Sequence, residues 1–241
     1  MEGQTKALMR DGNKGILGAA VVSVLFSLAV LNDFAITDPG VPLRRPHPGE
    51  FVVALVAGLL VAGVARFIDS RAEGLRGAST KSRTQLILFS IAAGVAMGQL
   101  ILAQMVVLAK FDPGSQQRYM RFISEPLLHP LHRTFSAAVI EEVLFRYVGM
   151  TAVALVVARR LGKPHLAYRV ALISSVAIFG LGHLPALSIV GLVIVLFNML
   201  AGFLYGWMFW HWGLMYAILA HFAAGSVRGM IILAFGSRLF A

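Results

Sequence analysis

The sequence contains no cysteine and few charged residues. Without cysteine, the chain has no disulfide, no cysteine nucleophile and no thiolate-ligated zinc site. Charged residues make up 13% of the 241 residues, against about 25% in soluble domains. Hydrophobic residues make up 58%, and the mean hydropathy is +0.79. This composition excludes an ordinary soluble domain and predicts an all-α polytopic membrane protein.

Several catalytic signatures are also missing from the sequence. The chain has neither the His-Glu-x-x-His helix of zincin metalloproteases nor a glycine-rich nucleotide-binding loop, and it lacks the Gly-x-Ser-x-Gly elbow of α/β-hydrolases. Asp33 is the one aspartate that could lie in the membrane, so a two-aspartate protease lacks its pair. Any catalysis must therefore use glutamate and histidine.

Seven apolar runs are long enough to cross a bilayer, for which a helix needs about 20 residues. They cover about residues 15–36, 51–68, 85–109, 134–158, 167–184, 187–210 and 213–235. An eighth span or a re-entrant segment remains an alternative. We expect a bundle of about seven to eight spans that forms one membrane domain. Within it, residues 1–133 provide N-terminal spans and an interfacial segment, and residues 134–241 provide the core.

Residues 115–133 alternate apolar with basic side chains, and Pro126 and Pro130 are expected to break a helix there. This pattern predicts either an amphipathic segment at the membrane interface or a simple linker. Near the end of the chain, three tryptophans surround His211 at an expected tight turn. They are Trp207, Trp210 and Trp212, and they predict an interfacial aromatic belt.

The lysine and arginine residues give a formal net charge of +10 and lie in short loops rather than along one face. This distribution favours contact with the lipid bilayer over nucleic acid. More of them fall on the side of the membrane that holds the N-terminus, so the positive-inside rule predicts a cytoplasmic N-terminus. The sequence contains no signal for an oligomeric state.

Three ionisable residues, Glu141, Glu142 and Arg146, interrupt the apolar run of residues 135–158. Charge at bilayer depth costs a few kcal/mol per residue, and such groups are functional by default. Glu142 and Arg146 are four apart and can pair on one helix face, whereas Glu141 is rotated by about 100° from Glu142. One carboxylate is then neutralised and the other is free. The alternative is a buried ion-pair cluster that only fixes helix packing.

Two histidines, His183 and His221, lie on other predicted spans. A carboxylate can accept a proton from water, and a neutral histidine can orient that water or donate to a leaving group. The same carboxylates and histidines could instead bind a divalent metal through oxygen and nitrogen ligands. A lone histidine in a span is more often a packing residue. Together with the glutamate pair, however, the histidines indicate an intramembrane hydrolytic site.

The order of these residues resembles the CAAX protease and bacteriocin-processing family of intramembrane proteases (the CPBP, or Abi, family). Its Glu-Glu-x-x-x-Arg motif matches Glu141, Glu142 and Arg146, and its Phe-x-x-x-His motif matches Phe179 and His183. Residues 202–207 and 217–222 are similar to the family's last two core helices. The resemblance covers about residues 134–225, whereas residues 1–110 match only as apolar spans.

This resemblance implies glutamate-dependent peptide hydrolysis within the bilayer. It assigns water activation to Glu141 and His183, and oxyanion stabilisation to His221. It also implies that the pair Glu142 and Arg146 holds the first core helix in place. If a metal is bound, zinc is the expected ion, and its ligands would be Glu141, His183 and His221; the sequence itself requires no cofactor.

The chain departs from the family pattern at Gly225, where the third motif usually has Asn or a similar polar residue four positions after its histidine. Loss of one oxyanion donor lowers a rate by about 10²- to 10³-fold. One hypothesis is that Arg228 or Asn198 supplies the missing polar group. The other is a site that is slower or tuned to a different task.

We therefore expect an intramembrane endopeptidase that cleaves a peptide bond in a membrane-associated protein or peptide, in C-terminal processing. The expected location is the bacterial inner (cytoplasmic) membrane. One alternative is a non-catalytic scaffold or bacteriocin-immunity-type protein, which Gly225 favours. A further alternative is a proton-coupled transporter, because buried carboxylates and histidines also form proton relays. A transporter would more naturally contain internal repeats, and none is visible in the sequence.

Overall fold

The computed structural model describes residues 20–32, 47–72, 81–121 and 128–240, and the regular elements within these ranges are all helices. This confirms the predicted all-α membrane bundle. The helices, in chain order, are Ala20–Asn32, α2 (Pro48–Ala72), α3 (Arg83–Phe111), α4 (Pro113–Arg121), α5 (Leu128–Glu141), η2 (Glu142–Met150), α6 (Thr151–Leu161), α7 (Pro164–Gly182), α8 (Ile189–Trp212) and α9 (Leu214–Leu239).

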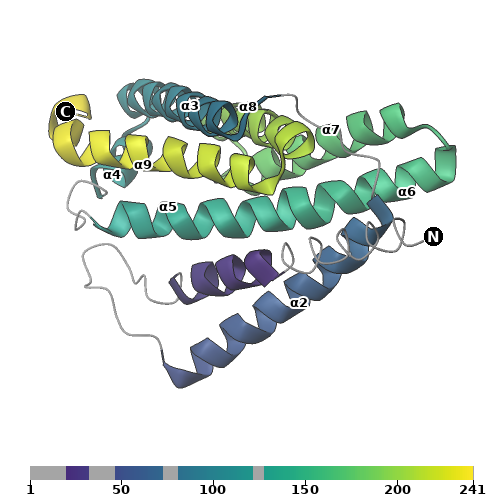
Figure 1. Cartoon of the computed structure of the whole chain (residues 1–241). Coiled ribbons are helices and arrows are strands. Elements are labelled where there is room, and N and C mark those ends of the chain that lie inside the picture. Colours follow the sequence, from purple (N-terminus) through teal and green to yellow (C-terminus); the bar gives the residue numbers. More distant parts are fainter. Residues whose placement is uncertain (1–19, 33–46, 73–80, 122–127, 241) are drawn as a thin grey trace, which may run out of the picture.

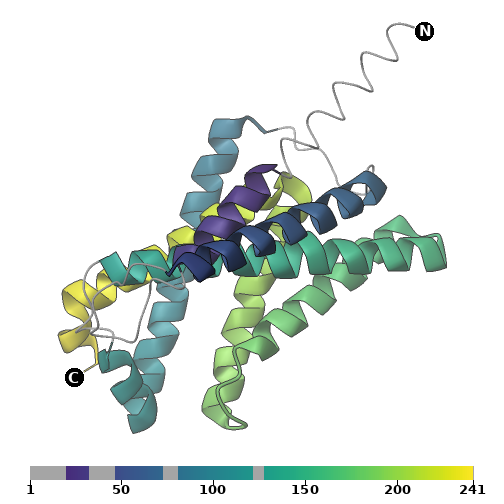
Figure 2. The same ribbon diagram turned by 90° about the horizontal axis from the view of Figure 1, so that it is seen from below.

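The helices are arranged around one long rod, which α5, η2 and α6 form without a break (Figure 1). Helices α3, α8 and α9 pack together on one side of this rod, and α7 lies between α6 and α8. The helix Ala20–Asn32 and α2 lie on the other side, as the view from below also shows (Figure 2). The rod is therefore the middle layer, and the two glutamates lie within it.

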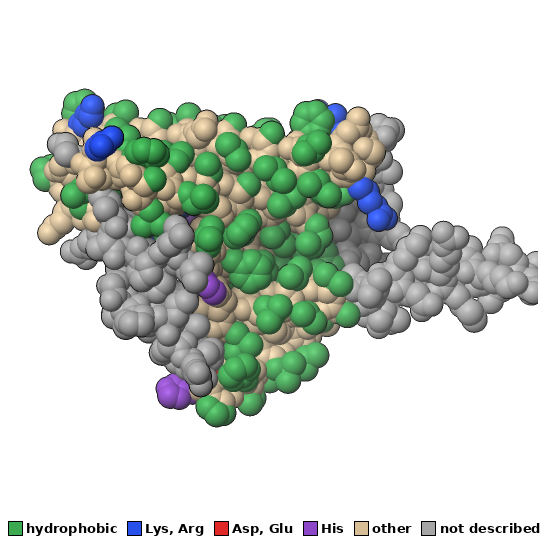
Figure 3. All heavy atoms as spheres, turned by 60° about the vertical axis from the view of Figure 1, so that its left-hand side comes forward, with side chains coloured by type: hydrophobic (Ala, Val, Ile, Leu, Met, Phe, Trp, Pro, Cys, Tyr) green, Lys and Arg blue, Asp and Glu red, His purple; other side chains and the backbone are tan. Residues whose placement is uncertain are grey.

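Four helices are long and apolar enough to cross a membrane, namely α3, α7 from His165 onward, α8 and α9. They match the predicted spans at 85–109, 167–184, 187–210 and 213–235. Only 28–39% of the most apolar stretch of each helix is buried. Hydrophobic side chains also cover much of the face in Figure 3, with lysine and arginine side chains near its ends. An apolar surface of this extent is typical of contact with lipid rather than water.

The predicted span at 134–158 differs in its start and in its helix type. The helix begins at Leu128, so the prediction that Pro130 breaks it is wrong. Proline is tolerated in the first turn because its missing N–H would have no partner there. The middle third of the rod is a π-helix of nine residues. Such wide turns are rare, and they occur often at functional sites.

The predictions for the first half of the chain are only partly covered by the described residues. The helix Ala20–Asn32 lies within the predicted span at 15–36, and the apolar part of α2, Pro48–Val64, overlaps the predicted span at 51–68. Both are shorter than a typical crossing helix. Pro126 lies outside the described residues. Within the expected interfacial segment, α4 packs on the end of α9, where the buried Tyr119 ring lies 5.4 Å from that of Phe240.

The helix Ala20–Asn32 is attached to the rod through Asn32. The Asn32 amide donates hydrogen bonds to the backbone oxygen of His132 (2.6 Å) and to the hydroxyl of Ser136 (2.7 Å). Its side-chain oxygen contacts the His132 ring, and the Ser136 hydroxyl donates to the backbone oxygen of Ala29 at 3.0 Å. This polar junction fixes the helix one turn before the glutamates of the rod.

The predicted aromatic belt is partly an internal cluster. Trp210 is only 5% exposed, and its ring lies 4.9 Å from that of Tyr168 on α7. The Trp212 ring contacts Trp207 at 4.9 Å and Phe89 of α3 at 6.3 Å. These rings join three helices beside the turn at Gly213, where φ is +103° and glycine is favoured.

Two glycines bring α3 against α9. A Cβ atom at Gly94 would collide with the backbone oxygen of Ala220, and one at Gly98 would collide with that of Ala224. The two glycines are four residues apart, so they form the small-xxx-small spacing that lets membrane helices approach closely. The two matched pairs also show that α3 and α9 run parallel.

We expect the substitution Gly98→Ala to destabilise the protein by about 1–3 kcal/mol, because the added methyl group would overpack the α3–α9 contact. The matched control is Gly63→Ala on α2, where a Cβ meets no atom within 4 Å and alanine favours the helix. The thermal midpoint in detergent measures both variants. Equal midpoints would show that the contact tolerates a side chain.

Candidate functional site

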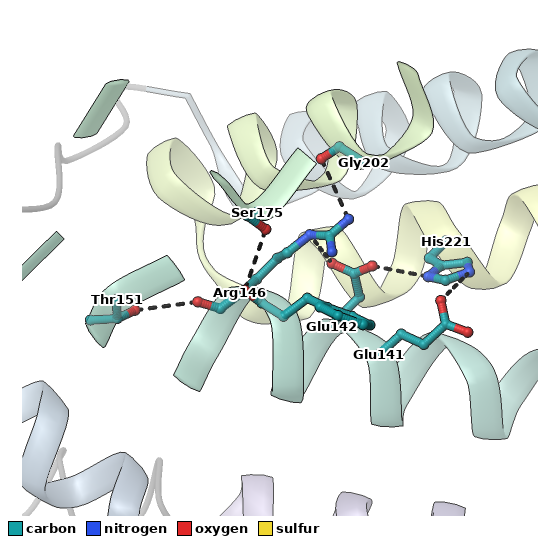
Figure 4. A network of polar contacts seen from close by, with 8 residues as sticks. Glu141, Glu142, Arg146, Thr151, Ser175, Gly202 and His221 are labelled. Atoms are coloured by element: carbon teal, nitrogen blue, oxygen red, sulfur yellow. Dashed lines mark hydrogen bonds and ion pairs between the residues drawn. The ribbon is translucent and has the colours of Figure 1, made fainter. Parts of the chain in front are cut away.

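The π-helix begins with a buried ion pair. Glu142 Oε2 lies 3.3 Å from Arg146 Nε, and both side chains are 0% exposed. The predicted pairing of these residues is therefore present (Figure 4). The guanidinium also donates to the backbone oxygen of Gly202 on α8 (3.4 Å) and lies 4.2 Å from the ring centre of Phe179 on α7. Arg146 thus joins the rod to two neighbouring helices.

Two hydroxyl groups bind backbone oxygens of the π-helix. Thr151 Oγ1 donates to the backbone oxygen of Arg146 at 3.4 Å, and Ser175 Oγ donates to that of Phe145 at 3.3 Å. In a π-helix, each backbone N–H bonds to the carbonyl oxygen five residues earlier instead of four. A hydroxyl that donates to a carbonyl oxygen of this wide turn adds a hydrogen bond and stabilises it. Both contacts appear in Figure 4.

His221 of α9 is held between the two glutamates. Its Nδ1 lies 3.0 Å from Glu142 Oε1, and its Nε2 lies 3.9 Å from Glu141 Oε2. Because an ion-paired carboxylate only accepts, Nδ1 must be the donor. The neutral ring then has its lone pair on Nε2, on the side of Glu141. The Tyr205 ring stacks on the imidazole at 4.8 Å and fixes its plane.

The two glutamates differ in their surroundings. Glu142 is fully buried between Arg146 and His221, whereas the Glu141 side chain is 25% exposed. Glu141 Oε2 has no hydrogen-bond partner among the described residues. Figure 4 shows that the two carboxylates reach His221 from adjacent positions of the rod. One carboxylate is thus neutralised and the other is available, as the sequence predicted.

His183 follows the end of α7. Its Nδ1 donates to the backbone oxygen of Phe179 at 2.8 Å, and its ring lies 4.8 Å from the Phe179 ring. A carbonyl oxygen only accepts, so the neutral imidazole again has its lone pair on Nε2. The Phe179 ring therefore lies beside both His183 and Arg146.

A cavity of about 350 Å³ lies among these helices. Its lining includes Glu141, His183 and His221, which the sequence placed on three separate spans. The cavity lining also includes the residues of the oxyanion hypothesis, namely Asn198, Gly225 and Arg228. Glu142 and Arg146 do not line the cavity and lie behind it. The structure thus brings the predicted site residues together. Some of them line one cavity, and the others form the ion pair that supports it.

Gly225 is in close contact with Thr134 of α5, which also lines the cavity. A Cβ atom at position 225 would collide with Thr134 Cγ2 and would lie 2.8 Å from Thr134 Oγ1. The space in front of residue 225 therefore holds the threonine side chain. An asparagine would not fit at this position unless Thr134 moved.

We expect Gly225→Asn to lower the thermal midpoint in detergent, at a cost of about 1–3 kcal/mol for overpacking. In the double variant Thr134→Ala/Gly225→Asn, the colliding methyl and hydroxyl groups are absent, so most of this stability should return. Thr134→Ala alone is the reference that completes the double-mutant cycle. If Gly225→Asn is as stable as the natural protein, the close contact does not explain the glycine.

The proposed zinc ligands do not form a metal-binding cluster in the part of the chain that the structure describes. There, no group of three or more His, Cys, Asp or Glu side chains is arranged to hold a metal ion. Glu141 and His221 face each other, whereas the hydrogen bond of His183 is to the α7 backbone. The zinc hypothesis therefore has no support from the geometry.

Some cavity residues could not be found from the sequence. Thr134 and Gln104 line the cavity, and Tyr205 both lines it and stacks on His221. Gln104 appears in the sequence only as a polar interruption of an apolar run. Polar residues at membrane depth are a general signal for a functional interior, but this signal does not indicate which helix face meets the cavity.

The comparison with protein families agrees with the motif analysis. No curated protein and no solved structure gives a significant match to the chain. Residues 123–227 match the model of the family described as Type II CAAX prenyl endopeptidase Rce1-like. This segment contains α5, η2, α6, α7, α8 and the half of α9 that carries His221. The resemblance to CAAX proteases that the two motifs predicted is therefore confirmed for residues 123–227.

Proposed function

We propose that this protein is an intramembrane endopeptidase that hydrolyses a peptide bond in a membrane-associated protein or peptide. One observation carries the proposal: Glu141, His183 and His221, from three helices, line a single cavity. The match of residues 123–227 to an endopeptidase family supports the same reaction. The enzyme would act within the bilayer, and we place it in the bacterial inner membrane with a cytoplasmic N-terminus.

Glu141 is the proposed general base. Glu141 lines the cavity with a side chain that is 25% exposed, and its Oε2 lies 3.9 Å from His221 Nε2. Two acceptors at this separation suit a water molecule that donates one hydrogen bond to each. Glu141 would take the proton as the water oxygen attacks the carbonyl carbon, and would later pass it to the leaving amine.

Glu142 and Arg146 are positioning residues in this mechanism. The ion pair orients Glu142, Glu142 fixes the tautomer of His221, and the Tyr205 ring fixes its plane. His183 also has its lone pair on Nε2, so it is proposed to accept the second hydrogen of the water in place of His221, as the family resemblance implies.

The oxyanion of the tetrahedral intermediate needs a hydrogen-bond donor. His221 cannot be this donor while its Nε2 accepts from the water, so we do not assign it the oxyanion role that the family resemblance implies. Asn198 lines the cavity, and its Nδ2 donates one hydrogen to the backbone oxygen of Ile194 at 2.8 Å, which leaves a second hydrogen for another acceptor. Arg228 is seven residues beyond His221, which is about 10 Å along the helix axis. We therefore assign the donor role to Asn198 rather than Arg228.

A non-catalytic scaffold is the second candidate, because Gly225 lacks the polar side chain that family members usually have. The buried Glu142–Arg146 pair would then serve packing alone. The accessible Glu141 carboxylate is the feature that this alternative leaves unused.

The test uses purified protein in liposomes with a library of membrane-anchored peptides, with products read by mass spectrometry. The proposal predicts defined products from the natural protein and none from Glu141→Gln. A parallel sample with a chelator tests the zinc hypothesis, and unchanged cleavage is expected. Equal cleavage by both proteins would contradict the role of Glu141. Folded protein that cleaves no library peptide would favour the scaffold.

A further inference from the structure

A second group of polar side chains lines the cavity and has no part in the proposed proton transfers. Gln104 of α3 is only 6% exposed, and its amide nitrogen Nε2 has no hydrogen-bond partner among the residues that the structure describes. A buried amide without a partner costs about 1–3 kcal/mol. A donor left in this state on a cavity wall is one that a ligand can satisfy.

Arg228 of α9 lines the same cavity and forms no hydrogen bond or ion pair with a described residue. Among the described residues, the charged groups near Arg228 include Glu141 and Arg133, beside the hydroxyls of Tyr205 and Tyr119. Arg133 also lines the cavity. A guanidinium at bilayer depth is unfavourable without an anionic partner. No carboxylate of the described residues forms an ion pair with Arg228, so an anion that binds it is favoured.

Because α3 and α9 pack in parallel, these two donors lie at nearly the same height along the helix axes. Gly98 faces Ala224, so the level of Arg228 on α9 corresponds to residue 102 of α3. Gln104 lies two residues further, which is about 3 Å along the axis. Arg228 lies about 10 Å, and Gln104 about 13 Å, beyond His221 along the same axis. The cavity thus has a hydrolytic region and, at a distance, a region rich in donors.

We propose that Gln104 and Arg228 form a subsite for the free C-terminal carboxylate of a peptide substrate. This inference rests on the proposed function. The neutral amide and the guanidinium would each donate to one carboxylate oxygen, while the chain upstream reaches Glu141. Apolar groups of Ile101, Met105 and Ile232 also line the cavity and suit hydrophobic substrate side chains.

The size of the cavity favours a peptide end over a phospholipid. A volume of about 350 Å³ is at the small end for ligand sites, which span about 300–1,000 Å³. Two acyl chains and a headgroup exceed this space.

The test measures binding of N-octanoyl-Ala-Leu-Val-Ala as the free acid and as the C-terminal amide, by calorimetry on full-length protein in detergent. The Glu141→Gln background prevents turnover. A charge-assisted hydrogen bond contributes about 1.5–3 kcal/mol, so the acid should bind about 10- to 100-fold more tightly than the amide. Gln104→Leu and Arg228→Gln should each reduce this ratio by at least several-fold, because they weaken binding of the acid more than binding of the amide.

Two matched controls use the same residue types on the same helices. Gln99→Leu on α3 and Arg238→Gln at the end of α9 change exposed side chains and should keep the ratio. Equal binding of acid and amide, no binding of the acid, or a ratio that survives both cavity variants would overturn the subsite. A different outcome is that phosphatidylglycerol competes with the acid for binding and that this competition disappears in Arg228→Gln. That result would also overturn the peptide subsite and would assign the two donors to lipid.

The binding assay separates this inference from the proposed hydrolysis. A protein that prefers the acid but cleaves no peptide contradicts the protease proposal alone. A protein that cleaves the acid and amide forms of a library peptide equally well contradicts the subsite alone.

Discussion

The substitution Glu141→Gln is expected to lower kcat by about 10²- to 10⁴-fold on any peptide that the natural protein cleaves, because general base catalysis contributes about this factor. Glutamine has nearly the same shape but cannot take a proton from water. KM should change little, since the proposed carboxylate subsite at Gln104 and Arg228 is distant from Glu141.

The same substitution should leave the fold intact. The Glu141 side chain is 25% exposed and makes no hydrogen bond in the described part of the chain, so its loss leaves no buried partner without a bond. The thermal midpoint should therefore match that of the natural protein. Glu50→Gln, in the first turn of α2, is the control for a glutamate outside the cavity. A rate equal to that of the natural protein would remove Glu141 from the mechanism.

The substitution Arg146→Met is expected to have the largest effect on stability, a loss of about 3–5 kcal/mol. It leaves the carboxylate of Glu142, which is 0% exposed, without its cation. It also removes the contacts of the guanidinium with Gly202 and Phe179. The rod, α7 and α8 would then lose the group that joins them.

A double variant separates the charge from the packing. In Glu142→Gln/Arg146→Met the unpaired buried charge is gone, and the glutamine side-chain oxygen can still accept from His221 Nδ1. The double variant should therefore be more stable than Arg146→Met, with the thermal midpoint in detergent as the measurement. If the two variants unfold at the same temperature, the ion pair contributes no more than packing.

The sequence predicts the features of this protein that depend on local pattern. Apolar runs of sufficient length indicate α3, α7, α8 and α9, because a bilayer imposes a minimum length on a spanning helix. The spacing of Glu142 and Arg146 indicates their pairing, and the rotation of Glu141 separates the second carboxylate. These inferences need only the geometry of one helix.

The features that the sequence does not predict depend on contacts between distant segments. The π-helix is supported by Ser175 on another helix, and its wide turn has no periodic signal. The collision between Gly225 and Thr134 depends on how closely α5 and α9 pack. Gln104 becomes a candidate binding residue only because the packing of α3 against its neighbours places this residue on the cavity wall.

The central claim is direct attack by a water molecule that Glu141 activates. The most direct test is a single turnover in H₂¹⁸O, with a peptide that the natural protein cleaves, followed by mass spectrometry of the upstream product. The account predicts one ¹⁸O atom in the new C-terminal carboxylate from the first turnover, and no product from Glu141→Gln on this time scale. An unlabelled first product with ¹⁸O in the peptide that contains Glu141 would contradict the account, because it would show that the carboxylate itself attacks the substrate.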